Sequence, residues 1–128
     1  MIYVDTSALL KLIWPEHGSA EVVDLIGNRA DLISSKLLAV EARRGALRND
    51  PTVLPRIDLL LSRFDLLDIS DPVIETASRL PDPMLRSLDA IHLATALLIR
   101  DDIDVLISYD DRLLAAAASH GLPTAAPA

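Results

Sequence analysis

The chain has 128 residues, which suffices for one hydrophobic core and is too short for two ordinary domains, so we expect a single domain over residues 1–128. It contains no cysteine, which excludes disulfides, thiolate metal sites and a cysteine nucleophile. Nineteen acidic residues against twelve Lys and Arg give a net charge of −7, which argues against binding of nucleic acid through a broad basic surface.

The first residues form the apolar run Ile2–Val4, and no basic region precedes it, which does not fit a secretory signal. Nowhere does an uninterrupted apolar stretch reach the roughly 18 residues that a membrane-spanning helix needs. From these features we expect a cytoplasmic protein without a membrane span.

Short apolar runs alternate with longer stretches of helical spacing along the chain. The runs are typical of buried parallel strands and comprise Ile2–Val4, Leu32–Ile33, Leu66–Ile69 and Val105–Ile107. Helix starts are indicated by Ser35, Asp50-Pro51, Asp71-Pro72 and Asp110. The alternation predicts an α/β fold, a three-layer α/β/α sandwich with a central parallel sheet. Ligands of such sheets bind outside the carboxyl ends of the strands.

Two acids follow predicted strands. Asp5 directly follows the first run and precedes an apolar helical stretch, and Asp110 comes after the run Val105–Ile107 and the pair Ser108-Tyr109. Both carboxylates are therefore expected in the crevice at the carboxyl ends. The alternative for each is a helix N-cap, and Asp111 competes with Asp110 for the same corner.

Two further acids lie in predicted helices among apolar neighbours. Glu41 follows Leu37-Leu38-Ala39-Val40, and its alternative role is an ion pair with Arg44 three residues later. Asp89 enters an almost wholly apolar helix, where the alternative is again a helix cap. His92 lies one turn after Asp89 and is a further candidate ligand, although a histidine there more often has a structural role.

Together, the four acids Asp5, Glu41, Asp89 and Asp110 converge on one crevice if the fold is right. Carboxylates that lie close together repel one another unless a cation neutralises them. All-oxygen sites favour Mg²⁺ or Mn²⁺, and such ions serve phosphodiester cleavage. We therefore predict a metal-dependent nuclease, whose metal would offset the acidic charge locally.

These motifs resemble the PIN-domain family over essentially the whole chain. The resemblance rests on Asp5-Thr6-Ser7 after the first strand, a mid-chain Glu41, the string Leu88 to Ala94 and Ser108-Tyr109-Asp110. Within the family, the size and the Leu88 to Ala94 string look like the VapC toxins of bacterial type II toxin–antitoxin modules.

The resemblance implies an Mg²⁺- or Mn²⁺-dependent endoribonuclease that is held inactive by a VapB-type antitoxin. Carried over by position, Asp5, Glu41, Asp89 and Asp110 are the catalytic acids, with Asp5, Asp89 and Asp110 as metal ligands. Thr6 or Ser7 would orient Asp5 or a water. Ser108 stands where these toxins more usually have Thr, and its hydroxyl can make the same hydrogen bond.

Substrate and partner contacts are expected near these acids and on apolar helices. Arg44, Arg86 and Arg112 lie close in sequence to site residues and are candidates for binding the RNA backbone, with surface ion pairing as the alternative. The stretches Leu9–Ile13 and Leu54–Leu61 are rich in Leu and Ile, so we expect the antitoxin or a second copy in a homodimer to cover them.

Two other functions are alternatives for a chain with this pattern. A phosphotransfer domain would need a second acid near the first strand or a later lysine, but the second residue after Asp5 is Ser7, and no lysine follows Lys36. A catalytically idle binding or co-repressor module of the same fold is the second alternative, and the complete set of acids argues against it.

Overall fold

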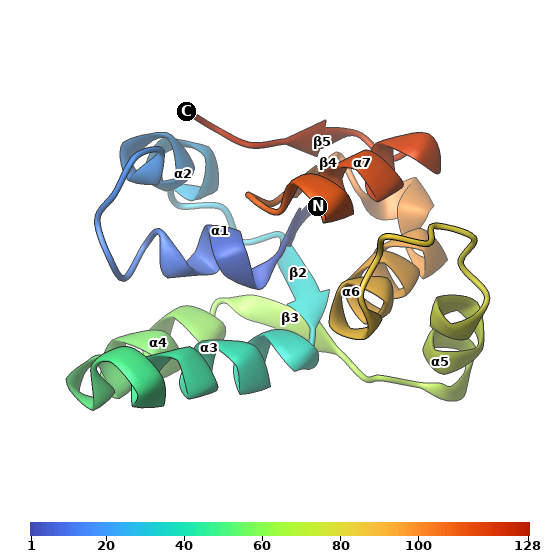
Figure 1. Ribbon diagram of the computed structural model, residues 1–128. Coiled ribbons are helices and arrows are strands. Elements are labelled where there is room, and N and C mark those ends of the chain that lie inside the picture. The colour runs from blue at the N-terminus through green and yellow to red at the C-terminus, as the bar shows by residue number, and fades with distance from the viewer.

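A five-stranded parallel sheet forms the centre of the computed structural model, which describes residues 1–128 (Figure 1). Its strands are β1 (Ile2–Val4), β2 (Leu32–Ser35), β3 (Phe64–Leu67), β4 (Val105–Ile107) and β5 (Thr124–Ala125). They are ordered β3-β2-β1-β4-β5, so the chain builds outward from β1 on one side and then crosses over to β4. The strand order reverses between β1 and β4, which is where sheets of this kind bind ligands.

Seven α-helices and two short 3-10 helices connect the strands. They are α1 (Thr6–Leu10), α2 (Ser19–Ile26), α3 (Leu37–Asn49), α4 (Leu54–Leu61), α5 (Asp71–Ser78), α6 (Ser87–Leu98) and α7 (Asp111–Ser119), with 3-10 helices at Pro51–Val53 and Arg100–Asp102. Side-chain capping sets several starts: Asp50 accepts from the Thr52 N–H, and Ser70 caps α5. None of these helices has both the length and the apolar character needed to cross a bilayer.

The two faces of the sheet carry separate hydrophobic clusters because neighbouring side chains in a strand point to opposite faces. Ile2 and Val4 pack with residues of α1 to α4, whereas Tyr3 between them packs with residues of α6 and α7. Helices therefore cover both faces, as Figure 1 shows. The predicted three-layer α/β/α sandwich with a central parallel sheet is confirmed.

Some boundaries differ from the sequence-based expectation. β3 spans Phe64–Leu67 rather than Leu66–Ile69, because its register with β2 begins at Phe64 opposite Leu32. The following Ile69 is 38% exposed and precedes the Ser70 cap. β5 was not predicted at all, since two residues carry no periodic signal.

Part of the expected apolar partner surface lies in the core. Leu9, Ile13, Ile57 and Leu61 belong to the core and are at most 5% exposed. The helices use these side chains for packing on the sheet, and the most exposed Leu or Ile of the two stretches is Leu59, at 71%. Other exposed apolar side chains lie on α2, α3, α5, α6 and the loop before α6: Val23, Val40, Leu47, Ile74, Met84, Leu88 and Leu98.

Candidate active site

Asp5 lies at the carboxyl end of the central strand and is 5% exposed. The pairing of β1 with β4 continues to this residue, whose backbone N–H donates to the Ile107 carbonyl at 3.0 Å. Asp5 stands at the N-cap position of α1, but its side chain makes no capping hydrogen bond, so the carboxylate does not act as a helix cap. Instead, Oδ2 accepts hydrogen bonds from Ser7 at 2.7 Å and Ser108 at 2.8 Å, while Oδ1 accepts none.

The two serines that hold Asp5 are themselves held by the backbone after β4. The Tyr109 N–H donates to Ser7 Oγ at 2.9 Å, and the Asp110 N–H donates to Ser108 Oγ at 3.0 Å. A serine hydroxyl has one proton to donate, and here each proton is directed to Asp5. The orientation of Asp5 is thus fixed by both strands that meet at the switch point.

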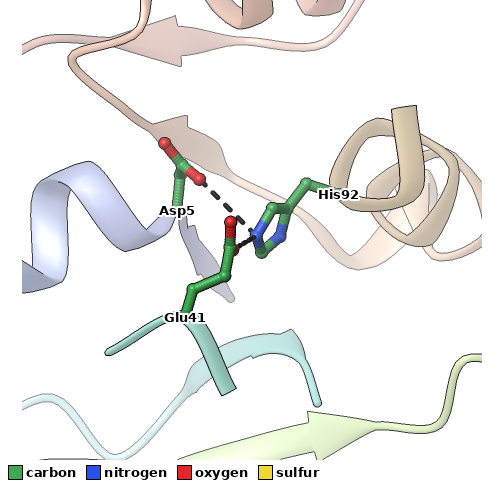
Figure 2. A group of neighbouring side chains, drawn as sticks. All are labelled: Asp5, Glu41 and His92. Carbon is green, nitrogen blue, oxygen red and sulfur yellow. Dashed lines mark hydrogen bonds and ion pairs between the residues drawn. The ribbon is translucent and has the colours of Figure 1, made fainter. Parts of the chain in front are cut away.

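Glu41 reaches the same corner from α3. Its Oε1 accepts a hydrogen bond from Thr6 at 2.7 Å and lies 2.7 Å from His92 Nε2 of α6 (Figure 2). The expected alternative, an ion pair with Arg44, is absent. Burial opposes ionisation of Glu41, but the hydrogen bonds from His92 and Thr6 outweigh it and hold the pKa of Glu41 below its usual value.

Asp5, Glu41 and His92 form a tight group, in which one candidate ligand atom of each lies within 4.8 Å of the others. His92 Nε2 is also 3.6 Å from Asp5 Oδ1, as the dashed lines in Figure 2 show. The histidine is 1% exposed, and its Nδ1 lies 2.8 Å from the Tyr3 hydroxyl. Both ring nitrogens are therefore engaged with protein groups.

Asp89 has no hydrogen bond or ion pair, although it is half-buried in the first turn of α6. It does not cap the helix. Burial raises the pKa of Asp89, and the negative charges of Asp110 and Asp5 raise it further. With Glu41 and Arg86, Asp89 lines an open hollow of about 330 Å³.

Asp110 does cap a helix, as the alternative role predicted. Its Oδ1 accepts from the Arg112 and Leu113 N–H groups at 2.9 and 3.1 Å, and its Oδ2 accepts no hydrogen bond. The neighbouring Asp111 is exposed, and it is the negative charge of Asp110 that raises the pKa of Asp89. Capping therefore holds Asp110 in place and leaves one oxygen available.

The four acids share one property: each has at least one carboxylate oxygen that accepts no hydrogen bond. These oxygens are Asp5 Oδ1, Glu41 Oε2, Asp110 Oδ2 and both oxygens of Asp89. The mutual repulsion at Asp89 is the kind that a divalent cation removes. An all-oxygen donor set of this charge fits Mg²⁺ or Mn²⁺.

Four of the twelve Lys and Arg side chains have no hydrogen bond or ion pair, and three of them are the predicted Arg44, Arg86 and Arg112. Arg86 lines the hollow beside Asp89, Arg44 follows Glu41 by one turn of α3, and Arg112 is in the first turn of α7. The fourth is Arg48, four residues after Arg44, which sequence reasoning missed. The spacing of Arg48 from Glu41 and Arg44 could have indicated it, because the three residues share a face of α3.

Comparison with known proteins gives a consistent picture. The family model of the PIN domain matches residues 2–119. The chain is 41% identical to Ribonuclease VapC35 of Mycobacterium tuberculosis and 39% identical to Ribonuclease VapC47 of the same species, in each case over 99% of this chain and 97% of the relative. A toxin–antitoxin complex from Klebsiella pneumoniae superposes with a TM-score of 0.75 at 23% identity, covering 100% of this chain and 98% of that one.

Proposed function

This chain belongs to the PIN-domain family, and we propose that it is a metal-dependent endoribonuclease that acts as the toxin of a type II toxin–antitoxin pair. The observation that carries the proposal is the proximity of four acids, each with an oxygen that accepts no hydrogen bond. Asp5 and Glu41 lie together, Glu41 and Asp89 line one hollow, and the charges of Asp110 and Asp5 act on Asp89. The relatives named ribonuclease match the chain over almost its full length. RNA cleavage of this kind belongs in the cytoplasm.

Asp5, Asp89 and Asp110 are the proposed metal ligands, through the oxygens that accept no hydrogen bond. When bound, Mg²⁺ or Mn²⁺ supplies a Lewis acid that activates water and stabilises phosphate charge. Ser7 and Ser108 hold Asp5 through its other oxygen. Thr6 fixes Oε1 of Glu41, so that Oε2 is available to accept a proton from the attacking water.

The RNA backbone is the proposed partner of Arg44, Arg48, Arg86 and Arg112. In a chain of net charge −7, eight of the twelve cations are occupied by carboxylates or carbonyls, and these four are free. Each lies within about two helical turns of a site acid in the sequence. They supply local positive charge for phosphate without a broad basic surface.

A VapB-type antitoxin is the proposed protein partner, since the structural neighbour from Klebsiella pneumoniae is a toxin–antitoxin complex. Leu88 of α6 is exposed and lines the hollow with Glu41 and Asp89, and Val40 and Leu47 of α3 are exposed on the helix that carries Glu41, so these apolar side chains suit a segment that covers the hollow. A homodimer with antitoxin bound to each copy is the assembly we expect. The unpaired acids favour catalysis over the alternative of an idle co-repressor.

The experiment is RNA cleavage by purified protein from which any antitoxin has been removed. Cleavage is expected only with Mg²⁺ or Mn²⁺, and EDTA should stop it. Asp5→Asn and Asp89→Asn should each abolish it, whereas Asp111→Asn should not. Metal-independent cleavage that survives both site substitutions would contradict the proposal, as would complete inactivity of the folded protein on total cellular RNA.

A further inference from the structure

The hydrogen bonds of His92 give this histidine a specific role beside the acids. We infer that His92 is a positioning residue rather than a metal ligand: with Tyr3 behind it, His92 holds the Glu41 carboxylate so that only one of its oxygens is free. The inference deepens the proposed function, in which Glu41 is a catalytic acid.

The proton positions follow from the chemistry of the two neighbours. An ionised carboxylate can only accept hydrogen bonds, so the 2.7 Å contact with Glu41 Oε1 requires the proton on Nε2 of His92. Nε2 then has no lone pair to offer a metal, although it lies among the carboxylates.

Tyr3 completes the arrangement from the other side of the ring. Its hydroxyl lies 2.8 Å from Nδ1 of His92. A neutral imidazole whose one proton is on Nε2 has an accepting lone pair on Nδ1, and the phenol O–H can donate to it. The rings meet edge to face, with centroids 5.9 Å apart and planes at 85°.

Burial keeps this chain of hydrogen bonds in place. Tyr3 is 0% and His92 1% exposed, and no buried polar side-chain atom lacks a partner. Because Tyr3 comes from the central strand and His92 from α6, the Tyr3–His92–Glu41 chain ties Glu41 of α3 to the sheet and to a second helix. Outer partners of this kind orient the residues that act on the substrate.

The first test reads the ring protons directly. Long-range ¹H–¹⁵N spectra of the protein, which has three histidines, would be recorded without metal and with Mg²⁺, and His92 assigned by its loss in His92→Gln. We expect a protonated Nε2 and a bare Nδ1 in both states. A proton on Nδ1, or an Nε2 that is bare in either state, would overturn the assignment.

The second test uses conservative rescue. His92→Gln keeps an N–H near Glu41, whereas His92→Leu fills similar space without a donor. We expect kcat to fall about 10-fold to 100-fold in His92→Leu and less in His92→Gln, with KM for RNA little changed. Equal kcat in the two variants, or an effect on KM alone, would overturn the role.

Tyr3→Phe extends the test to the outer end of the Tyr3–His92–Glu41 chain, because this substitution removes only the hydroxyl of Tyr3. A kcat lowered about 10-fold with unchanged KM is expected. Failure of RNA cleavage in the wild-type protein would sink the proposed function, but the spectra would still decide the protonation of His92.

Discussion

The Ser108 hydroxyl donates a hydrogen bond to Asp5 Oδ2 at 2.8 Å, across 103 positions of sequence and between the two strands that flank the switch point. Ser108→Ala removes one of the two donors that hold this oxygen. We expect cleavage activity to fall about 10-fold, by analogy with partners that orient metal ligands. The loss of folding free energy should be only about 1 kcal/mol, the usual net value of one hydrogen bond.

The matched control is Ser35→Ala. Ser35 is also fully buried, but its hydroxyl oxygen accepts a hydrogen bond from the Leu37 N–H at 3.1 Å, and it makes no hydrogen bond to a site acid. Urea unfolding and RNA cleavage would be measured on both variants. Similar stability with activity lost only in Ser108→Ala is the expected outcome, and equal activities would show that the Ser108 contact is structural alone.

Asp89→Asn should separate stability from function. The carboxylate has no partner, and burial together with Asp110 and Asp5 raises its pKa, so its charge destabilises the metal-free fold. Neutralising it should leave the metal-free melting temperature unchanged or higher, while activity falls by more than about 100-fold. A melting temperature that drops by several degrees would instead indicate that Asp89 holds the fold together.

Metal addition should stabilise the wild-type protein. A ligand at 100 times its dissociation constant adds about 2.7 kcal/mol to the folding free energy if it binds only the folded state. For a domain of this size that raises the melting temperature by on the order of 10 °C. Thermal melts with Mg²⁺, Mn²⁺ or EDTA would measure it, and the shift should vanish in an Asp5→Asn, Asp89→Asn double variant. A shift retained by that variant would place the ion elsewhere.

The sheet and the positions of Asp5 and Asp110 can be predicted from the sequence for a physical reason. Buried parallel strands are short apolar runs, and an acid that follows such a run within a few residues emerges near the carboxyl end, which applies to Asp5 and Asp110. The position of Asp110 just before a helical stretch also predicts that it caps this helix, as it does. The family and the α/β/α sandwich can therefore be predicted from the sequence alone.

Hydrogen bonds between side chains far apart in the sequence cannot be predicted in the same way. From spacing, Glu41 could pair with Arg44, but its actual partners are Thr6 and His92, the latter 51 positions away. Which partner wins depends on how α3 and α6 pack on the sheet. Tyr3 was read as part of an apolar run, because no local pattern shows that its hydroxyl meets a histidine from α6.

The free arginines can be tested by the salt dependence of RNA binding. Each phosphate contact contributes about 0.7 to the slope of log affinity against log salt for a single strand. Arg44→Ala with Arg48→Ala should lower the magnitude of the slope by about 1.4, measured by fluorescence anisotropy in a cleavage-deficient Asp5→Asn background. Arg79→Ala is the control, since Arg79 is exposed but paired with Glu75 at 2.8 Å and should leave the slope unchanged. If the double variant and the control give parallel plots, the α3 arginines do not contact phosphate, and the hollow lined by Arg86 would have to supply the charge alone.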